Sequence, residues 1–460
     1  MTILNKNLKL SMDVSLTNRK LDNGLTYYIY ENRSPTEKAI FSLIVKIGCV
    51  VEEINQRGIA HFIEHMCLAD KLRFSSQDGN YLHNIEASGY TNFDETVFTL
   101  ECLPLYKNIA RSITALKKMA DGSTIQVKQT EMVRHGIINE YNQISKKPKF
   151  KIREKVLFQL LNDSPYANMM PIGKLEHIRK VDYGHLTAFH SEWYCPELMA
   201  VIAVGNFETD MVEELIINNL SPLKNNKNSK KRIYQTIPSY EKRKLSINYF
   251  EDLPSSELHL YSLYPRPDIC TIYDMKIRLT EYMSYYMMVN FLKNVFERES
   301  IPIQDLICTK DGFLNRYEFA VIAIKTTGEI AQVLSILIQQ LMVIAGQGFS
   351  PDELHTCKKV FRQSLETSLN NSPTCRSRVL FNECLQHFLF NEPVLSLEKE
   401  YELNLNLIDE ITMSDIIACQ RLWCDNRNTA IAVNLPHNRK NTVEFAAINN
   451  CLNNLGCTAN

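Results

Sequence analysis

Residues 61–65 read H-x-x-E-H, a spacing that can place two metal ligands and a general base on one turn of a helix. In an α-helix, residues four positions apart lie on the same face, so His61 and His65 can direct two imidazole nitrogens at one metal ion. Glu64 lies near that face but is displaced around the helix, where its carboxylate can take a proton from an attacking water without binding the metal. The motif therefore predicts hydrolytic metal chemistry with Glu64 as the base.

A third ligand must come from elsewhere in the chain, because a catalytic zinc site has three protein ligands and one open position. Glu140 follows the motif by 75 residues and lies in the stretch from Val127 to Ile144, whose apolar residues recur at helical intervals. Two predicted helices that pack against each other can hold one ion between them. We expect one Zn²⁺ per chain, bound by His61, His65 and Glu140, since two imidazoles and a carboxylate suit zinc.

The order of the motif is the reverse of H-E-x-x-H and is typical of the inverzincins. The surrounding sequence resembles the pitrilysin family, which includes mitochondrial processing peptidase and insulin-degrading enzyme, and the short two-domain bacterial members fit best. The residues that carry this resemblance are spread along the chain: Asn23-Gly24-Leu25, Gly48, Arg57 to Met66, Phe93 to Phe98, Ile137 to Glu140, Pro171-Ile172-Gly173, Trp193 to Pro196 and Ala200 to Gly205. In that family the two histidines and the distal glutamate bind zinc, and the glutamate inside the motif activates water. The resemblance carries these roles over to the same four residues here.

The chain departs from the family pattern on the strand that aligns the substrate. Family members usually read Asn-Ala-x-Thr there, whereas this chain has Ser88, Gly89, Tyr90 and Thr91. By resemblance, an extended substrate adds a strand to the sheet edge near these residues and is held by main-chain hydrogen bonds. A second departure is Val133, which stands where the family commonly has a glutamate that supports the metal ligands. We therefore expect substrate contacts at residues 88–91 and an altered metal affinity.

A further departure lies in the second half of the chain. Family members that act alone or as homodimers carry an arginine and, seven residues later, a tyrosine, and both reach the bond that is cut. The best match here is Arg298, but Asp305 stands seven residues on. In split members of the family, an inactive second subunit supplies the arginine and the tyrosine. The resemblance implies that this chain is the catalytic subunit of a heterodimer; a homodimer, or a site that works without the tyrosine, is the alternative.

The sequence divides into two halves that look like a distant internal repeat. Each opens with strand-like segments and continues into long helices, an order that favours the α+β class. The only two tryptophans, Trp193 and Trp423, precede apolar strand-like runs in corresponding places. We assign residues 1–222 to a catalytic N-terminal domain, 223–236 to a polar, basic linker, and 237–460 to a non-catalytic C-terminal domain. The resemblance implies that each domain is an antiparallel sheet covered by helices and that the pair forms half of a clamshell.

Composition and charge narrow the class of protein further. With 45% hydrophobic and 22% charged residues in 460, the chain is expected to be a globular protein that buries large cores and needs no membrane. A formal net charge of −1 gives no overall field that would recruit nucleic acid. Residues 1–19 lack the apolar core of a secretory signal, from which we expect a cytoplasmic location.

These observations predict a zinc-dependent endopeptidase that hydrolyses peptides or unfolded segments, with the processing of a leader or precursor peptide as one role. One alternative is a non-catalytic, pitrilysin-like structural or binding subunit, although the complete set of four site residues argues against it. The other is a metal-dependent hydrolase of a non-peptide bond, for which the chain offers no supporting motif such as a glycine-rich phosphate loop.

Overall fold

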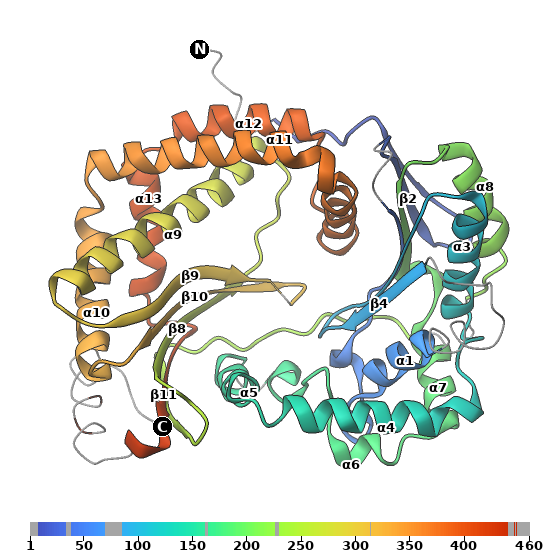
Figure 1. Cartoon of the computed structure of the whole chain (residues 1–460), viewed down its shortest axis with the longest axis horizontal. Helices are drawn as coiled ribbons and strands as arrows, with labels where there is room; N and C mark the ends of the chain where they lie inside the picture. The colour runs from blue at the N-terminus through green and yellow to red at the C-terminus, as the bar shows by residue number, and fades with distance from the viewer. Residues whose placement is uncertain are drawn as a thin grey trace.

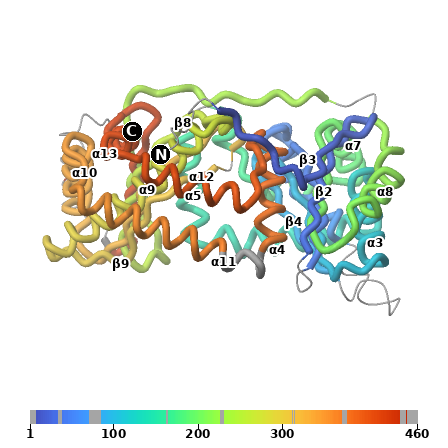
Figure 2. Tube along the Cα trace, turned by 90° about the horizontal axis from the view of Figure 1, so that it is seen from above, coloured from blue at the N-terminus to red at the C-terminus, as the bar shows by residue number. Residues whose placement is uncertain are grey.

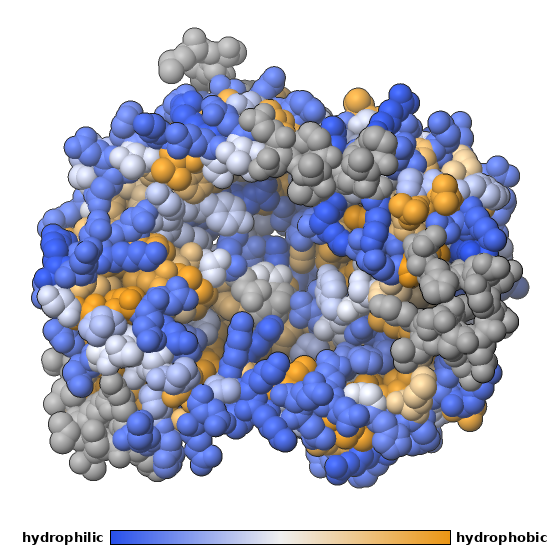
Figure 3. Space-filling model, in the orientation of Figure 1, coloured by the Kyte–Doolittle hydropathy of each residue, from blue (hydrophilic) through white to orange (hydrophobic). Residues whose placement is uncertain are grey.

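The computed structural model of the chain contains two β-sheets, each covered by helices, that face one another (Figure 1). The structure describes residues 8–33, 38–69, 85–161, 164–225, 230–312 and 314–439, together with 446 and 448. An extended segment that begins at residue 230 crosses from the first half to the second along one side of the molecule (Figure 2). The space-filling view shows that the face between the two halves is hollowed at its centre (Figure 3). The predicted α+β class is confirmed.

The N-terminal half is built on a six-stranded sheet with the order β1-β2-β6-β3-β5-β4. Its strands are β1 (Leu16–Lys20), β2 (Thr26–Glu31), β3 (Ala39–Val45), β4 (Ile85–Thr91), β5 (Thr96–Cys102) and β6 (Met199–Gly205). Neighbouring strands are antiparallel, as expected, except for β2 and β6, which are parallel. The central strands β3 and β6 are buried along their whole length because both faces of the sheet are covered, whereas β4 is an edge strand with alternate residues exposed.

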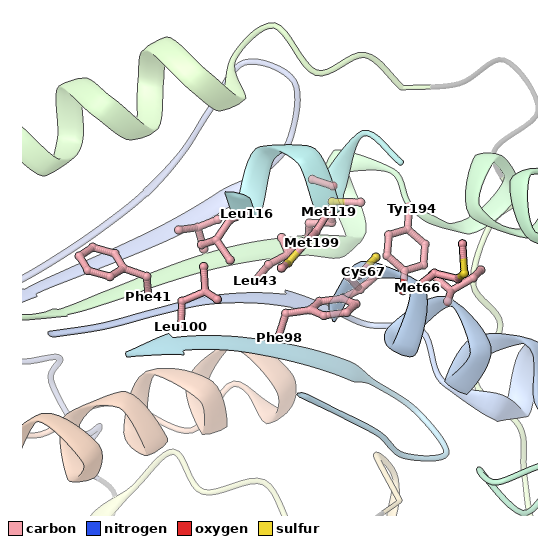
Figure 4. Packing of buried hydrophobic residues seen from close by; sticks show 14 of the residues in the cluster. Phe41, Leu43, Met66, Cys67, Phe98, Leu100, Leu116, Met119, Tyr194 and Met199 are labelled. Carbon is pink, nitrogen blue, oxygen red and sulfur yellow. The ribbon is translucent and has the colours of Figure 1, made fainter. Parts of the chain in front are cut away.

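Most helices of this half cover one face of the sheet. The helices of this half are α1 (Ile59–Leu68), α3 (Tyr106–Ala120), α4 (Val127–Ile144), α5 (Pro148–Leu160), α6 (Leu175–Ile178), α7 (Tyr183–Trp193) and α8 (Thr209–Leu220), of which α5 is the exception that packs elsewhere. Figure 4 shows the core between sheet and helices, where Met66 of α1 and Leu116 of α3 lie over Leu43 and Phe98. Each such buried side chain contributes about 1.5–3 kcal/mol, so α1 is held rigidly against the sheet.

The C-terminal half repeats this plan with a five-stranded sheet of order β7-β11-β8-β10-β9. Its strands are β7 (Lys244–Phe250), β8 (Ser256–Pro265), β9 (Ile303–Asp311), β10 (Tyr317–Thr326) and β11 (Thr429–Pro436), of which β7 and β11 are parallel. Its helices are α9 (Ile272–Arg298), α10 (Ile330–Gln347), α11 (Pro351–Phe390), α12 (Leu397–Glu410) and α13 (Met413–Gln420). Short 3₁₀ helices occur in both halves. The N-terminal half has η1 (Cys49–Val51), η2 (Ile54–Gln56), η3 (Pro165–Asn168) and η4 (Pro196–Leu198), and the C-terminal half has η5 (Arg421–Cys424) and η6 (His437–Arg439). Trp193 ends α7 before β6 and Trp423 lies in η5 before β11, so the two tryptophans occupy corresponding places.

Two helices pack on the sheet of the opposite half. Val156 of α5 lies in an apolar cluster with Phe319 of β10, and Leu385 of α11 lies in another with Ile202 of β6. Figure 1 shows the end of α11 turning toward the first sheet and α5 lying under the second. The two halves therefore share their cores.

A buried ion pair reinforces this junction. Arg232, inside the predicted linker, bonds through its guanidinium to the carboxylate of Asp94 and to the carbonyl oxygen of Lys46, and the Arg232 and Asp94 side chains are 3% and 2% exposed. The backbone N–H of Asn315, in the C-terminal half, donates to Asp94 Oδ2 at 2.8 Å. Asp94 thus joins both halves to the segment between them. Because α8 ends at Leu220 and β7 begins at Lys244, this segment contains the proposed linker.

Among the described helices, α10 is long and apolar enough by length and composition to cross a membrane. Seven of its residues, between Ile330 and Ile344, lie in the core of the C-terminal half. Gln332, Ser335 and Gln339 are on its exposed side. This distribution is typical of an amphipathic helix that covers a sheet.

Candidate active site

Helix α1 begins at a tight turn that is held by a buried acid. Gly58 has φ of +100° at the position before the helix, and a Cβ there would lie 3.0 Å from the Cα of Gly173. Glu52, which is 5% exposed, accepts hydrogen bonds from the N–H groups of Gly58 at 2.8 Å and Ala60 at 2.9 Å. A carboxylate at a helix amino terminus satisfies free N–H groups and favours the helix dipole. Glu52 therefore fixes the start of the helix that carries the motif, a role that the sequence analysis missed; its position six residues before a glycine turn was the available signal.

The predicted metal ligands converge. His61 Nε2 lies 3.1 Å from His65 Nε2, and Glu140 Oε2 lies 3.2 Å from His65 Nε2 and 3.8 Å from His61 Nε2. Donor atoms in a tetrahedral zinc site with bonds of about 2.0–2.2 Å are roughly 3.3–3.6 Å apart, so this spacing fits one ion. Among the described residues, these three are the group of acids, histidines and cysteines whose ligand atoms come this close together. The donor set and its geometry fit zinc.

The electrostatics of the metal-free ligands differ from one another. Burial lowers the pKa of His61 to about 4, so this imidazole stays neutral near pH 7. Burial alone would lower the pKa of His65 as well, but the hydrogen bond to Glu140 and the carboxylates of Glu140 and Glu64 outweigh it, and the pKa is raised. The hydrogen bond from His65 lowers the pKa of Glu140. Without a metal, His65 and Glu140 therefore favour a charged pair.

Within the described part of the chain, one metal ligand, His61, lacks the hydrogen bond that would orient its ring. Nδ1 of His61 is buried and has no hydrogen-bond partner among the described groups. Metal-binding histidines usually donate this second N–H to an acceptor, which orients the ring. Val133, the apolar residue at the position of the family's supporting glutamate, is itself buried. The ring of His61 is instead held by packing within α1 and against its neighbours.

Glu64 lies beside the ligands without joining them. Its Oε2 is 3.9 Å from His61 Nε2, and the hydroxyl of Thr91 donates to the same oxygen at 3.1 Å. The residue is 5% exposed, and this burial raises the pKa of the carboxyl to about 7. A carboxyl with a pKa near neutrality can both take and return a proton at physiological pH.

The predicted substrate residues lie on the edge strand β4, and they divide between its two faces. Thr91 bonds Glu64, and a Cβ added at Gly89 would lie 3.1 Å from Glu64 Oε1, so these two face the base. Ser88 and Tyr90 alternate with them, point to the other face and are exposed. Among the described strands, β4 has a neighbour on one side only, β5. The structure thus places Gly89 and Thr91 at the base and leaves one strand edge open.

Arg298 is not brought to this cluster. It is the last residue of α9, it is exposed, and its Nε donates to the carbonyl oxygen of Asn294 at 3.2 Å. Figure 1 shows this end of α9 on the opposite side of the molecule from α1. Asp305, seven residues on, is an exposed residue of the edge strand β9 and lies opposite Lys325 of β10 in the strand register. The predicted contact between Arg298 and the substrate stays a prediction, because Arg298 does not lie beside the metal-ligand cluster of this chain.

Comparison with known proteins agrees with the fold and the motif. Residues 27–171 match the family described as insulinase (peptidase family M16), and residues 180–361 match the peptidase M16 inactive domain. The zinc protease PQQL-like of Arabidopsis thaliana is 26% identical over 407 residues, which cover 86% of this chain and 40% of that protein. The probable zinc protease PqqL of Escherichia coli K12 is 25% identical over 422 residues, which cover 88% of this chain and 45% of that protein. The chain spans less than half the length of these relatives.

Solved structures show the same architecture. The first half of the periplasmic protease PqqL from Escherichia coli superposes with a TM-score of 0.84 at 22% identity and covers 98% of both chains. Pitrilysin superposes with a TM-score of 0.70 at 14% identity, covering 98% of this chain and 51% of that one. At these identities the likeness concerns the fold, which is the pitrilysin-like half of a clamshell that was predicted.

One prediction is wrong. We expected a cytoplasmic location from the first residues, but the related PqqL of Escherichia coli is a periplasmic protease. The prediction rested on the composition of residues 1–19 alone. The absence of an apolar core in residues 1–19 gave no information on the location of proteins with this fold.

Proposed function

Because this chain belongs to peptidase family M16, we propose that it is a zinc-dependent endopeptidase whose general base is Glu64. The observation that carries this proposal is the position of the Glu64 carboxylate, which lies between the converged His61, His65 and Glu140 side chains and the edge strand β4. Metal ligands, base and a place for an extended chain are thus adjacent.

The residues of the site have separate tasks. His61, His65 and Glu140 would hold zinc, which supplies a Lewis acid that activates water and polarises a peptide carbonyl. Glu64 takes the proton of the attacking water and returns it to the amine nitrogen that leaves. Because Thr91 donates to Oε2, we assign the moving proton to Oε1. A pKa of about 7 suits both transfers.

We infer that the substrate is an extended peptide or unfolded segment that pairs with β4. An open strand edge binds through main-chain hydrogen bonds and therefore accepts many sequences. Gly89 supports this placement, since the absence of a side chain there leaves room beside Glu64 Oε1. A precursor or leader peptide would meet these requirements.

We further infer that the complete enzyme contains a second M16-like half. The relatives named above are more than twice as long as the matched segment, and residues 180–361 match a family domain described as inactive. In this chain the position of the family's tyrosine is Asp305, so a different M16-like subunit would supply the arginine and tyrosine, whereas a homodimer of this chain would have to work without the tyrosine.

The experiment that tests the proposal is cleavage of quenched fluorescent peptides by the zinc-loaded chain, alone and with a candidate second M16-like half. Glu64→Gln is the control, because it keeps the shape of the side chain and removes the base. We expect cleavage that depends on the second half and is abolished by the substitution. Stoichiometric zinc with no cleavage in either preparation would instead favour a non-catalytic subunit.

A further inference from the structure

A cavity of about 410 Å³ lies where the two halves meet. Its wall is formed by Lys46, just after β3, by Arg266 and Arg316 at the ends of β8 and β10, and by Phe388 near the end of α11. Figure 1 shows the end of α11 and the β9–β10 hairpin meeting in the middle of the molecule, where Figure 3 shows the hollow. The cavity therefore lies where α11 meets the β9–β10 hairpin, whose Asn315 Nδ2 donates to the carbonyl oxygen of Leu389 at 3.0 Å.

The main charge in this cavity is not neutralised by the protein. The Lys46 ammonium lies 4.1 Å from the centre of the Phe388 ring, and no described carboxylate lies within ion-pairing distance of it. Burial, with a smaller effect of the Arg232 guanidinium, lowers the pKa of Lys46 to about 8. Burial and then the charge of Lys46 lower the pKa of His387. No described carboxylate offsets these effects at either group.

The other charged groups that line the cavity leave this excess in place. Arg266 is occupied, since Nη1 lies 3.0 Å from Glu318 Oε1 and Nη2 donates to the carbonyl oxygen of Gly312 at 2.6 Å. Arg316 is exposed at the rim, where its guanidinium lies 5.0 Å from the Tyr234 ring. Asp268 is the acid of the lining, and it is exposed and outside ion-pairing distance of the described cations. With Arg266 paired, the described lining has two further cationic side chains, Lys46 and Arg316, and one carboxylate, Asp268, which leaves a net charge of about +1.

The cavity and the candidate base lie on opposite faces of the first sheet, because the Lys46 side chain packs against Phe388 of α11, whereas Glu64 lies on α1. Val45, the residue before Lys46, is paired with Thr96, and Thr96 is paired with Thr91, whose hydroxyl bonds Glu64. Two strand spacings of roughly 4.8 Å separate Val45 from Thr91, about 10 Å in all. An extended peptide covers that distance in about three residues. A peptide paired with β4 would direct alternate side chains to the α11 face, and it is these side chains that can extend toward the cavity.

We propose that this cavity binds a carboxylate of the substrate peptide, with Lys46 as its ion-pair partner and Arg316 as a second donor at the rim. The carboxylate belongs either to an acidic side chain or to the peptide carboxyl terminus. This inference rests on the proposed function, because it supposes that a peptide occupies the hollow, and it adds a preference for an acidic group near the cleaved bond.

Binding of fluorescent peptides to the Glu64→Gln chain tests the proposal without cleavage. Four versions of one peptide are compared by anisotropy: glutamate or glutamine at one position, each with a free or an amidated carboxyl terminus. We expect the preferred carboxylate to tighten binding by about tenfold, as a charge-assisted hydrogen bond in a partly desolvated site does. The comparison of glutamate with glutamine tests a side-chain carboxylate, and the comparison of the free with the amidated terminus tests the terminal carboxylate.

Lys46→Met keeps an unbranched apolar stem over Phe388 and removes the charge, and Lys118→Met removes an exposed charge on α3 as the matched control. The preference should fall below about twofold in the first variant and persist in the second. Equal binding of all four peptides by the parent chain, or a preference that survives Lys46→Met, would overturn the proposal. If the chain cleaves peptides but binds all four versions equally, the proposed function stands and the carboxylate site is wrong. If the chain prefers one carboxylate but cleaves no peptide, the carboxylate site stands and the proposed function is wrong.

Discussion

The hydroxyl of Thr91 and the carboxylate of Glu64 are joined by a 3.1 Å hydrogen bond that links the edge strand β4 to the helix that carries the metal ligands. The strand on which we place the substrate and the group that we assign as base are therefore held in one register. A donor to a carboxylate stabilises its ionised form, and Thr91 accordingly lowers the pKa of Glu64 against the larger, opposite effect of burial.

Thr91→Val should raise the pKa of Glu64, because it removes that donor with little change of shape. The acidic limb of the pH profile of kcat/KM is expected to move to higher pH, with a loss of roughly tenfold in rate at pH 6. Thr114→Val is the control, since that hydroxyl bonds the carbonyl oxygen of Ala110 on an exposed face of α3. An acidic limb that does not move in Thr91→Val would show that the hydrogen bond has no part in tuning the base.

Glu140→Gln should weaken zinc binding, since it replaces a charged ligand by a neutral one. We expect a loss of at least about tenfold in affinity, measured by competition with a chromogenic chelator. Glu131→Gln on the same helix is the control, because Glu131 is exposed and paired with Arg134. Equal zinc affinity of the two variants would remove Glu140 from the ligand set.

Zinc affinity should fall as the pH is lowered, by about tenfold per unit below the pKa of His65. In the metal-free site this pKa is raised above its ordinary value of 6.5, so His65 is protonated at pH 5.5 to 6.5 and must lose a proton to bind metal. His61, with a pKa of about 4, is already neutral in this range, and Glu140 is ionised because its pKa is lowered. Comparison of zinc dissociation constants at pH 5.5 and 6.5 measures the slope. A slope of two protons would mean that His61 is also charged.

Gly89→Ala should reduce activity more than stability. A Cβ there would lie 3.0 Å from both Leu68 Cδ1 and the Val97 carbonyl oxygen and 3.1 Å from Glu64 Oε1, so the strand or the base must shift. We expect at least a tenfold fall in kcat/KM with about 1 kcal/mol of destabilisation. Gly136→Ala, inside α4 with no atom within 4 Å of its added Cβ, should instead stabilise the protein by about 0.5–1 kcal/mol. Chemical denaturation of both variants gives the comparison.

Arg232→Met should destabilise the protein by about 3–5 kcal/mol, because it leaves the Asp94 carboxylate buried without its partner. Arg427→Met, which breaks the exposed pair with Asp425, should cost less than about 1 kcal/mol. The midpoints of urea unfolding measure both effects. Similar midpoints for the two variants would mean that Asp94 is satisfied by Tyr166 and Asn315 alone.

The local parts of the site could be predicted from the sequence, and the non-local parts could not. His61, Glu64 and His65 lie on one helix turn, so their spacing alone implies their geometry, and Glu140 required one further helix. Strand alternation was needed to separate Gly89 and Thr91 from Ser88 and Tyr90. The roles of Glu52 and Asp94 depend on backbone N–H groups and on partners far along the chain, which residue types do not reveal.

The fold shows the same division. The α+β class and the two repeated halves follow from periodicity, but the parallel pairs β2–β6 and β7–β11 join segments more than 160 residues apart. The 40-residue helix α11 has a clear start, with Ser350 as its cap, and nothing in its sequence indicates that its end leaves its own half.

Because α5 covers the sheet of the C-terminal half and α11 covers the sheet of the N-terminal half, neither half alone buries both faces of its own sheet. A fragment ending near residue 222 would present Tyr28, Ile44 and Ile202 to water, and the complementary fragment would present Phe319 and Ala432. We therefore expect the two fragments to be insoluble when each is produced alone and to recover a native shape when produced together. A cut in the connection between them would leave a nicked molecule that stays assembled and melts in a single transition.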